Sequence, residues 1–389
     1  MPLRDHLRDG PPVSISSVLV VGTGLIGTSV ALALREHGVD VHLADRDPRA
    51  VRLAAELGAG REWPGPPGRD AAGPAEAAEP VQPVEPVDLA VIAVPPPYVA
   101  DELLRLQRQG AARCYTDVAS VKALPLRRAA ELGCDLTSFL AGHPLAGSER
   151  SGPAAARADL FLGRPWAYCP TEETSVDAVE AVLGLIKLCG AEPVRVGAAE
   201  HDEAVALISH APHVTAAAVA ARLADAPQIA LGLAGQGVRD VTRIAAGDPA
   251  LWTGILSGNT LPVAEVLEEI SADLAAAAAA LRRAAATGEE AMREVTDLLR
   301  RGNVGRGRIP GKHGGPARDY AVVQVVIGDR PGELARLFQA AEEAGVNIED
   351  VRLEHAPGLP LGMAELSVQP EAAATLAAAL RAQGWDVPT

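Results

Sequence analysis

Short apolar runs alternate with longer amphipathic stretches along the first third of the chain. Compact apolar runs bounded by turn residues are typical of buried strands, and the stretches between them have helical periodicity. Such alternation predicts a mostly parallel sheet, which is normally covered by helices on both faces. The expected strands are Val18–Val21, Val41–Ala44, Leu89–Val94, Cys114–Asp117 and about Leu136–Leu140.

The pattern changes further along the chain. Residues 176–300 are rich in Ala and Leu at helical spacing and predict an all-α domain, and the Gly-rich, basic stretch 301–319 predicts a linker. Residues 320–389 run strand, helix, two strands, helix, strand, which predicts a small α+β domain with βαββαβ order. Residues 1–15 are expected to be a disordered N-terminus, and the Pro- and Gly-rich residues 65–87 a surface loop.

Composition narrows the classes of function. The chain has 389 residues and 48% of them are apolar, so it can bury sizeable cores and is not intrinsically disordered. Its 35 Lys and Arg stand against 50 Asp and Glu, a formal net charge of −15 that argues against a nucleic-acid partner. An anionic substrate must therefore be held by local positive groups.

Cysteine usage and hydropathy bear on location. The uncharged segment Pro11–Leu34 is interrupted by glycines, so a strand, turn and helix explain it better than a signal peptide or membrane span. We expect a cytoplasmic protein with reduced thiols, no membrane association and no metal site. The cysteines form neither a CxxC pair nor a disulfide framework; they are Cys114, Cys134, Cys169 and Cys189.

A glycine motif directly follows the first expected strand. Gly22 permits a tight turn, Gly24 lets the backbone approach a pyrophosphate, and Gly27 lets the following helix pack closely on the strand. The unpaired N–H groups and dipole of that helix favour an anion. The sequence thus predicts a Rossmann-type domain over residues 16–175, with cofactor contacts from Gly22-Thr23-Gly24-Leu25-Ile26-Gly27.

An acidic residue at the end of the second strand indicates which dinucleotide binds. Asp45 lies where a carboxylate would accept hydrogen bonds from the ribose of NAD and repel the 2′-phosphate of NADP. Arg46 beside it could tolerate that phosphate, so NAD is favoured without NADP being excluded. Val94 and Pro95 end another strand, so their turn is expected to line the cofactor crevice, although a rigid loop without contacts would have the same sequence.

Further motifs follow in order: Thr116-Asp117-Val118-Ala119-Ser120-Val121-Lys122, Gly142-His143-Pro144-Leu145-Ala146-Gly147-Ser148-Glu149, Ser209-His210-Ala211-Pro212-His213 and Arg239-Asp240-Val241-Thr242-Arg243-Ile244-Ala245. With the glycine motif and Trp252, this set resembles the prephenate/arogenate dehydrogenase family from about Val18 to Leu299. The chain departs from the usual family pattern at Gln236, Val238, Ala119 and Ala211, which bears on side-chain specificity.

The resemblance implies a reaction. Family members pass a hydride from C4 of a cyclohexadienol to NAD while the C1 carboxylate leaves as carbon dioxide, and prephenate then gives 4-hydroxyphenylpyruvate. Arogenate dehydrogenase, which forms tyrosine directly, is the nearest alternative. A regulatory protein that senses NAD and amino acids is an alternative of another class, disfavoured because His143, Ser120 and Arg243 are all present.

The resemblance also implies residue roles. His143 would deprotonate the C4 hydroxyl, a task suited to a group with an ordinary pKa of about 6.5, so the rate should fall below about that pH. Ser120 would orient the hydroxyl and the nicotinamide, although it could instead cap a helix. Arg243 would bind a carboxylate of the dicarboxylate substrate through paired hydrogen bonds, the alternative being a salt bridge with Asp240.

Other polar residues complete the expected site. His213 and, less directly, His210 would face the substrate side chain, and a helix would put them on neighbouring faces. Trp252 would close the pocket, with a place in the helical core as its alternative. Lys122 and Glu149 are expected substrate contacts that could equally be solvated or gating charges.

Two further expectations concern assembly and regulation. In the resembled family the helical region forms a homodimer, whereas apolar stripes alone would also fit packing within one chain. The C-terminal domain resembles an ACT regulatory domain, in which Gly332 would let the backbone approach an amino acid. An aromatic amino acid such as tyrosine is the expected effector, and a purely structural dimerisation module is the alternative.

Overall fold

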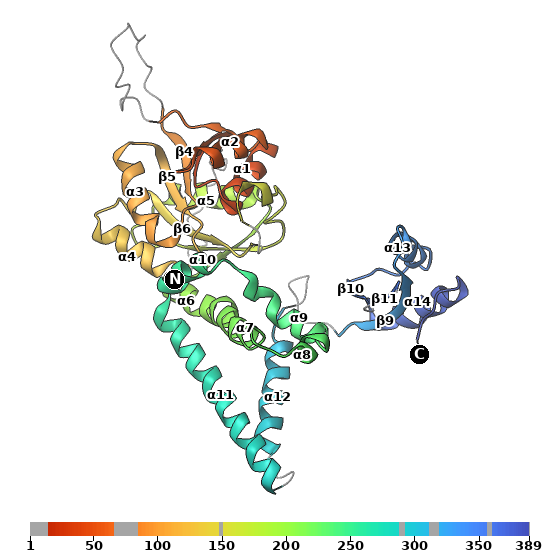
Figure 1. Ribbon diagram of the computed structural model, residues 1–389. Helices are drawn as coiled ribbons and strands as arrows, with labels where there is room; N and C mark the ends of the chain where they lie inside the picture. Colours follow the sequence, from red (N-terminus) through yellow and green to blue (C-terminus); the bar gives the residue numbers. More distant parts are fainter. Residues whose placement is uncertain are drawn as a thin grey trace. The chain divides into compact units, whose positions relative to one another are not determined.

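The structure is a computed structural model that describes residues 15–65, 85–147, 151–287, 292–310, 319–355 and 360–388. Nearly all of the expected disordered N-terminus, most of the 65–87 loop, and Glu149 lie outside these residues. The chain divides into two compact units, Met1–Ile270 and Ser271–Thr389 (Figure 1).

The first unit is built on an eight-stranded sheet of order β3-β2-β1-β4-β5-β6-β7-β8. Neighbouring strands are parallel except for β6 and β7, which are antiparallel. The predicted parallel sheet is confirmed, and the carboxyl ends of β1, β4, β5 and β6 lie at one edge. The strands are β1 Ser17–Val21, β2 Asp40–Ala44, β3 Arg61–Glu62, β4 Val87–Ile92, β5 Ala112–Asp117, β6 Phe139–Pro144, β7 Pro165–Cys169 and β8 Glu192–Arg195.

Alternate side chains of the strands enter two cores, one on each face of the sheet. Val18 and Val20 pack with residues of α1, α2 and α5, whereas Leu19 and Val21 pack with residues of α3 and α4. This division follows from the two-residue period of a strand. The helices are α1 Leu25–Glu36, α2 Pro48–Glu56, α3 Val99–Arg108, α4 Ala123–Glu131 and α5 Val176–Leu188, with the short turns η2 Pro96–Tyr98 and η3 Pro153–Ala155.

The sheet continues beyond the expected domain boundary at residue 175. Helix α5 packs on the core of the first face, and β8 pairs with β7 through Arg195. Strand β8 lies within the stretch expected to be helical. All four of its residues are exposed and one is Pro193, so this edge strand has no apolar alternation for a sequence pattern to detect.

Helices dominate from Ala198 onward, as expected. Residues Ala198–Ala221 form one long helix, which among the described residues is alone in being long and apolar enough to cross a membrane by length and composition. It consists of α6 Ala198–Val205, the π-turn η4 Ala206–His210 and α7 Ala211–Ala221. It is followed by α8 Gln228–Gly232, α9 Gln236–Thr242, η5 Arg243–Ala246, α10 Pro249–Ser257 and α11 Thr260–Thr287.

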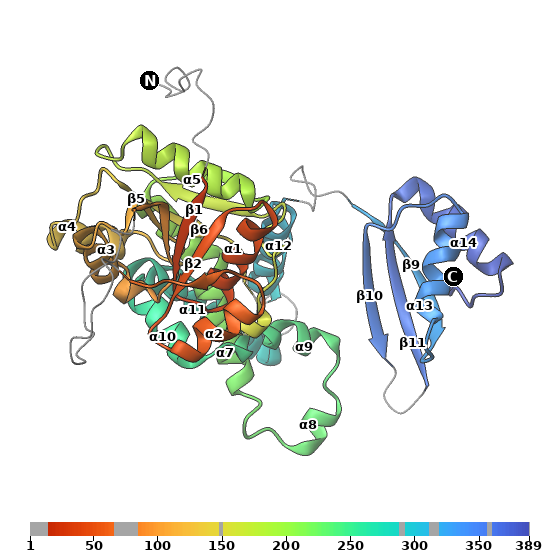
Figure 2. The same cartoon turned by 90° about the horizontal axis from the view of Figure 1, so that it is seen from above.

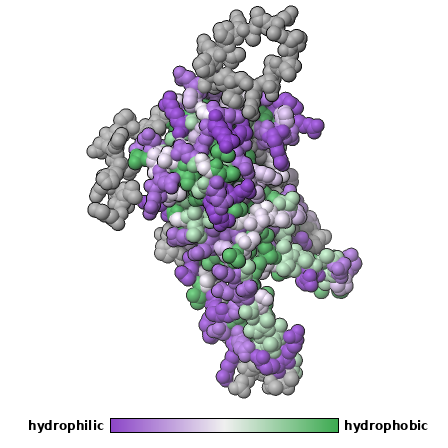
Figure 3. All heavy atoms as spheres, turned by 90° about the vertical axis from the view of Figure 1, so that its left-hand side faces the viewer, coloured by the Kyte–Doolittle hydropathy of each residue, from purple (hydrophilic) through white to green (hydrophobic). Residues whose placement is uncertain are grey.

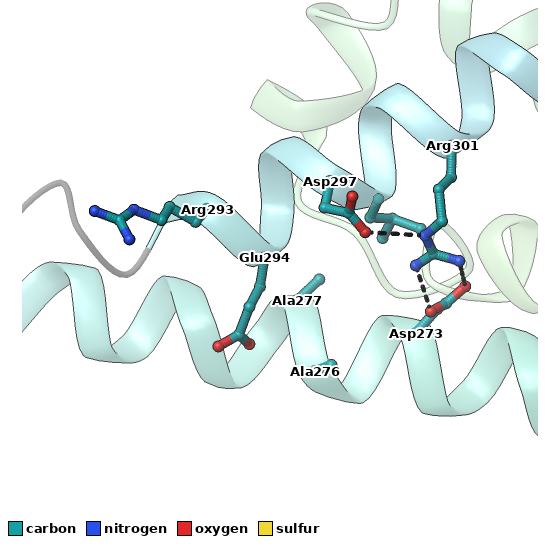
Figure 4. Close-up of a pocket in the computed structure, with 8 residues that line it drawn as sticks. Asp273, Ala276, Ala277, Arg293, Glu294, Asp297 and Arg301 are labelled. Atoms are coloured by element: carbon teal, nitrogen blue, oxygen red, sulfur yellow. Dashed lines mark hydrogen bonds and ion pairs between the residues drawn. The ribbon is translucent and has the colours of Figure 1, made fainter.

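The start of the expected linker is helical, which corrects the prediction for residues 301–307. Helix α12 spans Arg293–Gly307, despite glycines that weaken helix formation. Arg301 donates to both oxygens of Asp273 on α11, at 2.8 and 3.2 Å, and to Asp297 at 3.2 Å (Figure 4). The contact with Asp273 joins α12 to α11, which no local pattern contains, and it helps to hold α12 helical.

The end of the chain forms a small three-stranded antiparallel sheet of order β10-β11-β9 with two helices on one face (Figure 2). The expected order is confirmed as far as the second helix. The last expected strand is reduced to one bridge between Val326 and Asp386, since Pro388 soon follows and lacks an N–H. The elements are β9 Ala321–Gly328, α13 Glu333–Glu343, β10 Asp350–His355, β11 Leu361–Val368 and α14 Pro370–Ala382.

Candidate active site

The glycine motif lies between β1 and α1 and forms a close-packed turn with one open position. Gly22 has φ +101°, and a Cβ on it would lie 2.3 Å from the carbonyl oxygen of Ala93. A Cβ on Gly27 would lie 1.9 Å from the oxygen of Gly22. By contrast, a Cβ on Gly24 would meet nothing within 4 Å. The motif thus has the two packing glycines and the open approach that a pyrophosphate requires.

Asp45 lies at this turn, half-buried at the end of β2. Its Oδ2 accepts from the backbone N–H of Thr23 at 2.6 Å, and its Oδ1 accepts from the N–H of Asp47 at 2.9 Å. Arg46 is exposed. The carboxylate is therefore held beside the glycine motif, where the ribose of a dinucleotide is expected.

The turn after β4 adjoins the same motif. The N–H of Ala93 donates to the carbonyl of Val21 at 2.6 Å, which fixes this turn against the end of β1. Val94 is half-buried and Pro95 is exposed just beyond it. Both residues thus lie at the carboxyl edge of the sheet, and their expected cofactor contacts stay a prediction.

Lys122, between β5 and α4, is entirely buried, which corrects its expected role as a substrate contact or solvated charge. Its ammonium pairs with the carboxylate of Asp117 and donates to the carbonyl of Gly142 at 2.6 Å. Asp117 also accepts from the N–H of Gly142 at 3.1 Å. The pair ties β5 to β6, and removing one member of such a pair typically costs about 3–5 kcal/mol.

Ser120 lies half-buried in the same turn. The N-cap of α4 is Lys122, and the N–H groups of Lys122 and Ala123 donate to Asp202 rather than to Ser120. Ser120 is therefore not the cap of this helix, and its expected contact with substrate and nicotinamide stays a prediction.

His143 lies near the carboxyl end of β6 and is half-buried. Its Nδ1 is 2.9 Å from Nε2 of His201, and Nδ1 of His201 is 2.8 Å from Oδ1 of Asp202. Both partners are 3% exposed and lie on α6. Neither residue was predicted as part of the site, since its only local signal is a His-Asp pair on a predicted helix.

The surroundings of His143 favour a neutral imidazole. Burial lowers the pKa of His143 well below its usual value, and the neighbouring His201, Lys122 and His210 side chains lower it further. A neutral ring has a lone pair with which to accept a proton. The decline in rate expected below about pH 6.5 therefore moves to lower pH.

The π-turn η4 determines where His210 lies. Pro212 lacks an N–H and its ring crowds the carbonyl four residues earlier, so the helix cannot keep regular α hydrogen bonds there. In a continuous α-helix, His201 and His210 would be about two and a half turns apart and on opposite faces. The wider turn changes this rotation, and both histidines join one hydrogen-bonded network.

Burial keeps His210 neutral, and that network orients its ring. Nδ2 of Asn259 donates to the backbone carbonyl of Asp202 at 2.7 Å and lies 3.1 Å from Nδ1 of His210. Burial lowers the pKa of His210 to about 4. Because the amide nitrogen is a donor, Nδ1 of His210 accepts and its Nε2–H is left to donate.

His213 and Trp252 form a stacked pair. Their ring centroids are 3.5 Å apart and the planes differ by 12°. A Cβ on Gly247 would lie 2.4 Å from Nε1 of Trp252, so only glycine fits beside this stack. Trp252 is half-buried against a histidine rather than in a purely apolar core, and its expected place at the substrate pocket stays a prediction.

Arg243 is exposed on η5, which packs against α7, the helix that bears His213. Asp240, its alternative partner, accepts instead from Nε2 of Gln236 at 2.8 Å. The predicted carboxylate-binding role of Arg243 stays a prediction. In the part of the chain that the structure describes, no group of three or more His, Cys, Asp or Glu side chains could hold a metal ion.

Comparison with known proteins identifies the family. Residues 30–195 match the prephenate dehydrogenase nucleotide-binding domain, and residues 197–297 match the prephenate dehydrogenase dimerization domain. A probable prephenate dehydrogenase of Streptomyces niveus, NovF, is 40% identical over 375 residues, covering 95% of this chain and 98% of that protein. The chain belongs to the prephenate dehydrogenase family.

Solved structures agree with this assignment. The prephenate dehydrogenase of A. aeolicus, in complex with hydroxyphenyl propionate and NAD+, is 26% identical with a TM-score of 0.63, covering 77% of this chain and 100% of that one. The arogenate dehydrogenase of Synechocystis is also 26% identical, with a TM-score of 0.58 and coverage of 75% and 98%. The predictions of a dinucleotide-binding domain, of an NAD-dependent oxidoreductase and of the family are confirmed, and the boundary near residue 196 agrees with the end of β8.

Proposed function

We propose that this protein catalyses the NAD-dependent oxidative decarboxylation of prephenate to 4-hydroxyphenylpyruvate, with release of carbon dioxide and NADH, in tyrosine biosynthesis. The observation that carries the proposal is the place of His143. A neutral, half-buried imidazole stands at the carboxyl edge of the same sheet that bears the open glycine turn. Ligands of open α/β sheets bind at this edge.

The residues divide the chemistry between them. His143 accepts the proton of the C4 hydroxyl through Nε2, because Nδ1 is engaged by His201. NAD, held by residues 22–27 and Asp45, supplies the hydride acceptor. Ser120, half-buried near the end of β5, orients the hydroxyl.

The other half of the site binds the dianion. Arg243 pairs with a substrate carboxylate, and a charge-assisted contact of this kind contributes about 1.5–3 kcal/mol. The neutral His210 donates its Nε2–H, and His213 with Trp252 forms a flat wall for the side chain. Glu149, outside the described residues, is a further proposed contact.

The test is NADH formation from prephenate by the full chain. We expect turnover with NAD and little with NADP. Arogenate is the second candidate substrate, because an arogenate dehydrogenase is as similar to this chain as a prephenate dehydrogenase is. The ratio of kcat/KM for the two compounds decides between them, and no NADH from either would refute the proposal.

The functional form we propose is a cytoplasmic homodimer. Five large apolar side chains in residues 198–270 are 60–78% exposed, namely Leu207, Ile208, Ile229, Leu233 and Leu261. On the face drawn in Figure 3, apolar residues reach the surface among polar ones. Burying such side chains against a second copy would remove them from water, and the matched dimerization domain supports this assembly. Sedimentation of the purified chain as a monomer at micromolar concentration would contradict it.

We propose that residues 320–389 act as an ACT-type regulatory domain that binds an aromatic amino acid. A hollow lies where β9 turns into α13, and Gly332 there has φ +89°. Arg330 can pair with a carboxylate and Glu354 with an ammonium group. The hollow is lined by Ile327, Gly328, Asp329, Arg330, Glu333, Leu334, Leu353, Glu354 and Gly362.

Regulation is tested by assaying the full chain with and without tyrosine. We expect tyrosine to inhibit the wild type, and Arg330→Ala to weaken the inhibition about tenfold through a lost charge-assisted contact. Arg352→Ala, an exposed change on β10 outside the hollow, is the control. Equal turnover with and without tyrosine, phenylalanine or tryptophan would remove this part of the proposal.

A further inference from the structure

A chain of hydrogen bonds runs from His143 to a buried carboxylate. His143 Nδ1 is 2.9 Å from His201 Nε2, and His201 Nδ1 is 2.8 Å from Asp202 Oδ1. The three residues come from β6 and α6, and His201 and Asp202 are almost completely buried. The proposed reaction gives neither His201 nor Asp202 a contact with substrate or cofactor.

The carboxylate end of this chain is fixed from several sides. Oδ1 of Asp202 also accepts from the N–H of Lys122 at 2.8 Å, and Oδ2 accepts from the N–H of Ala123 at 2.9 Å. These are among the first N–H groups of α4, which otherwise lacks a side-chain cap. Asp202 thus caps α4 from a distant helix, which leaves its carboxylate little freedom to move.

The donor and acceptor in each of these hydrogen bonds follow from the chemistry of the three side chains. An ionised carboxylate only accepts, so His201 must carry its proton on Nδ1. With His201 neutral, its Nε2 has only a lone pair and accepts from His143. His143 is therefore protonated on Nδ1, and its Nε2 lone pair is free at the crevice.

We propose that His201 and Asp202 are positioning residues that hold His143 in the tautomer with Nε2 unprotonated, and that the Asp202 carboxylate offsets the positive charge that His143 gains during turnover. The inference rests on the proposed function. When the C4 hydroxyl proton moves to Nε2 of His143, the imidazolium keeps Nδ1–H on His201, and the Asp202 carboxylate supplies the balancing negative charge. No proton leaves the chain of residues in this step.

Other charged groups do not offer the same support. His201 faces His143 from α6, Lys122 from the turn after β5 and His210 from η4, and all three disfavour a positive charge on its ring. The carboxylate of Asp117 is engaged by Lys122 and by backbone N–H groups. Asp202 is therefore the carboxylate that reaches His143 through hydrogen bonds.

The first experiment compares Asp202→Asn with the wild type. The amide can still accept from the start of α4, but its NH2 group can donate to His201 and reverse the whole chain, which would put the proton of His143 on Nε2. We expect kcat to fall about 100- to 10,000-fold, the range typical of a lost general base, with KM for prephenate changed less than about threefold. Asp88→Asn is the matched control, since Asp88 also accepts from backbone N–H groups but lies at the amino end of β4, at the opposite edge of the sheet.

A second pair of variants guards against a simple folding defect. His201→Gln retains an acceptor for His143 and a donor for Asp202, so we expect kcat within about tenfold of the wild type. His201→Leu has neither group, and we expect kcat to fall about 100-fold or more. A structural role alone would not separate these variants once their thermal unfolding temperatures match. Equal kcat for both would overturn the proposal.

The tautomer of His143 can be measured by NMR whether or not the enzyme is active. Long-range proton–nitrogen correlation spectra of the full chain labelled with 15N-histidine distinguish the two nitrogens, and His143→Asn identifies its signals among the nine histidines. We expect a protonated Nδ1 and an unprotonated Nε2 in the wild type, reversed in Asp202→Asn. The opposite wild-type tautomer would overturn the inference even in an active enzyme. Conversely, a wild type inactive on prephenate and arogenate would refute the proposed function while the spectrum still decided the tautomer.

Discussion

Two parts of the first unit contrast in how completely they are built within one chain. The closed half consists of Asp117, Lys122, His143, His201 and Asp202, whose polar side-chain groups are buried or half-buried and paired with one another or with backbone. The open half is the segment 228–246, from α8 to η5. None of its three helical elements has a buried residue, and Arg243 is exposed.

The contrast shows which parts of catalysis are preorganised. Buried polar groups are costly unless they are paired, and a fully paired network holds one geometry. The closed half therefore has its proton acceptor oriented before substrate arrives. The open half has to gain its order from substrate and, on our proposal, from a second copy of the chain. Changes in the closed half should lower kcat, whereas changes in the open half should raise KM.

The largest effect is expected from His143→Asn in the closed half. Loss of the proton acceptor should lower kcat about 100- to 10,000-fold with little change in KM. Steady-state NADH formation with prephenate measures both constants. His37→Asn, an exposed histidine just after α1, is the control and should leave both constants unchanged. Full turnover by His143→Asn would remove the mechanism.

The matching change in the open half is Arg243→Ala. Loss of a charge-assisted contact should raise KM roughly 10- to 100-fold with a smaller effect on kcat. Arg243→Lys should restore only part of the affinity, because lysine cannot form the paired hydrogen bonds of a guanidinium. Arg127→Ala, an exposed arginine of α4, is the control. A drop confined to kcat would mean that the open half does not bind the carboxylate.

Cofactor choice provides a third, smaller effect. Asp45→Ala should lower kcat/KM for NAD about tenfold, because a hydrogen-bond acceptor for the ribose is lost. It should also reduce the preference for NAD over NADP, because the negative charge that repels the 2′-phosphate is lost. Asp47→Ala removes the cap of α2 two residues away and should cost about 1 kcal/mol of stability without changing that preference. An unchanged NAD to NADP ratio in Asp45→Ala would place the ribose elsewhere.

The smallest effect concerns pH. The folded protein disfavours protonation of His143, so the base stays active below its ordinary pKa of about 6.5. We expect kcat/KM to remain level as pH falls through 6.5 and to decline only in more acidic solution. The pH profile of kcat/KM reports this group in the free enzyme. A decline of kcat/KM centred at or above pH 6.5 would show that His143 is more exposed to solvent than the structure indicates.

Features that depend on residues adjacent in the chain could be predicted before the structure was known. Strand and helix periodicity, the glycine motif and the acidic residue at the end of β2 are local, so the nucleotide-binding domain and the order of elements in the C-terminal domain were predicted. His143 was found because its motif is contiguous. The same reasoning missed β8, whose exposed edge residues have no apolar period, and extended the linker into α12, which contacts with α11 hold helical.

The hydrogen-bond partners of the site residues follow from tertiary packing and could not be predicted. His201 is 58 residues from His143, and Asp202 is 80 residues from the Lys122 N–H that it accepts. Lys122 was predicted to contact substrate, whereas in the structure it is buried and paired with Asp117. Hydrogen bonds between distant segments depend on packing that brings those segments together, and the tautomer of a histidine depends on its partners. Residue order specifies neither directly, because the partners are chosen by the fold rather than by their neighbours in the chain.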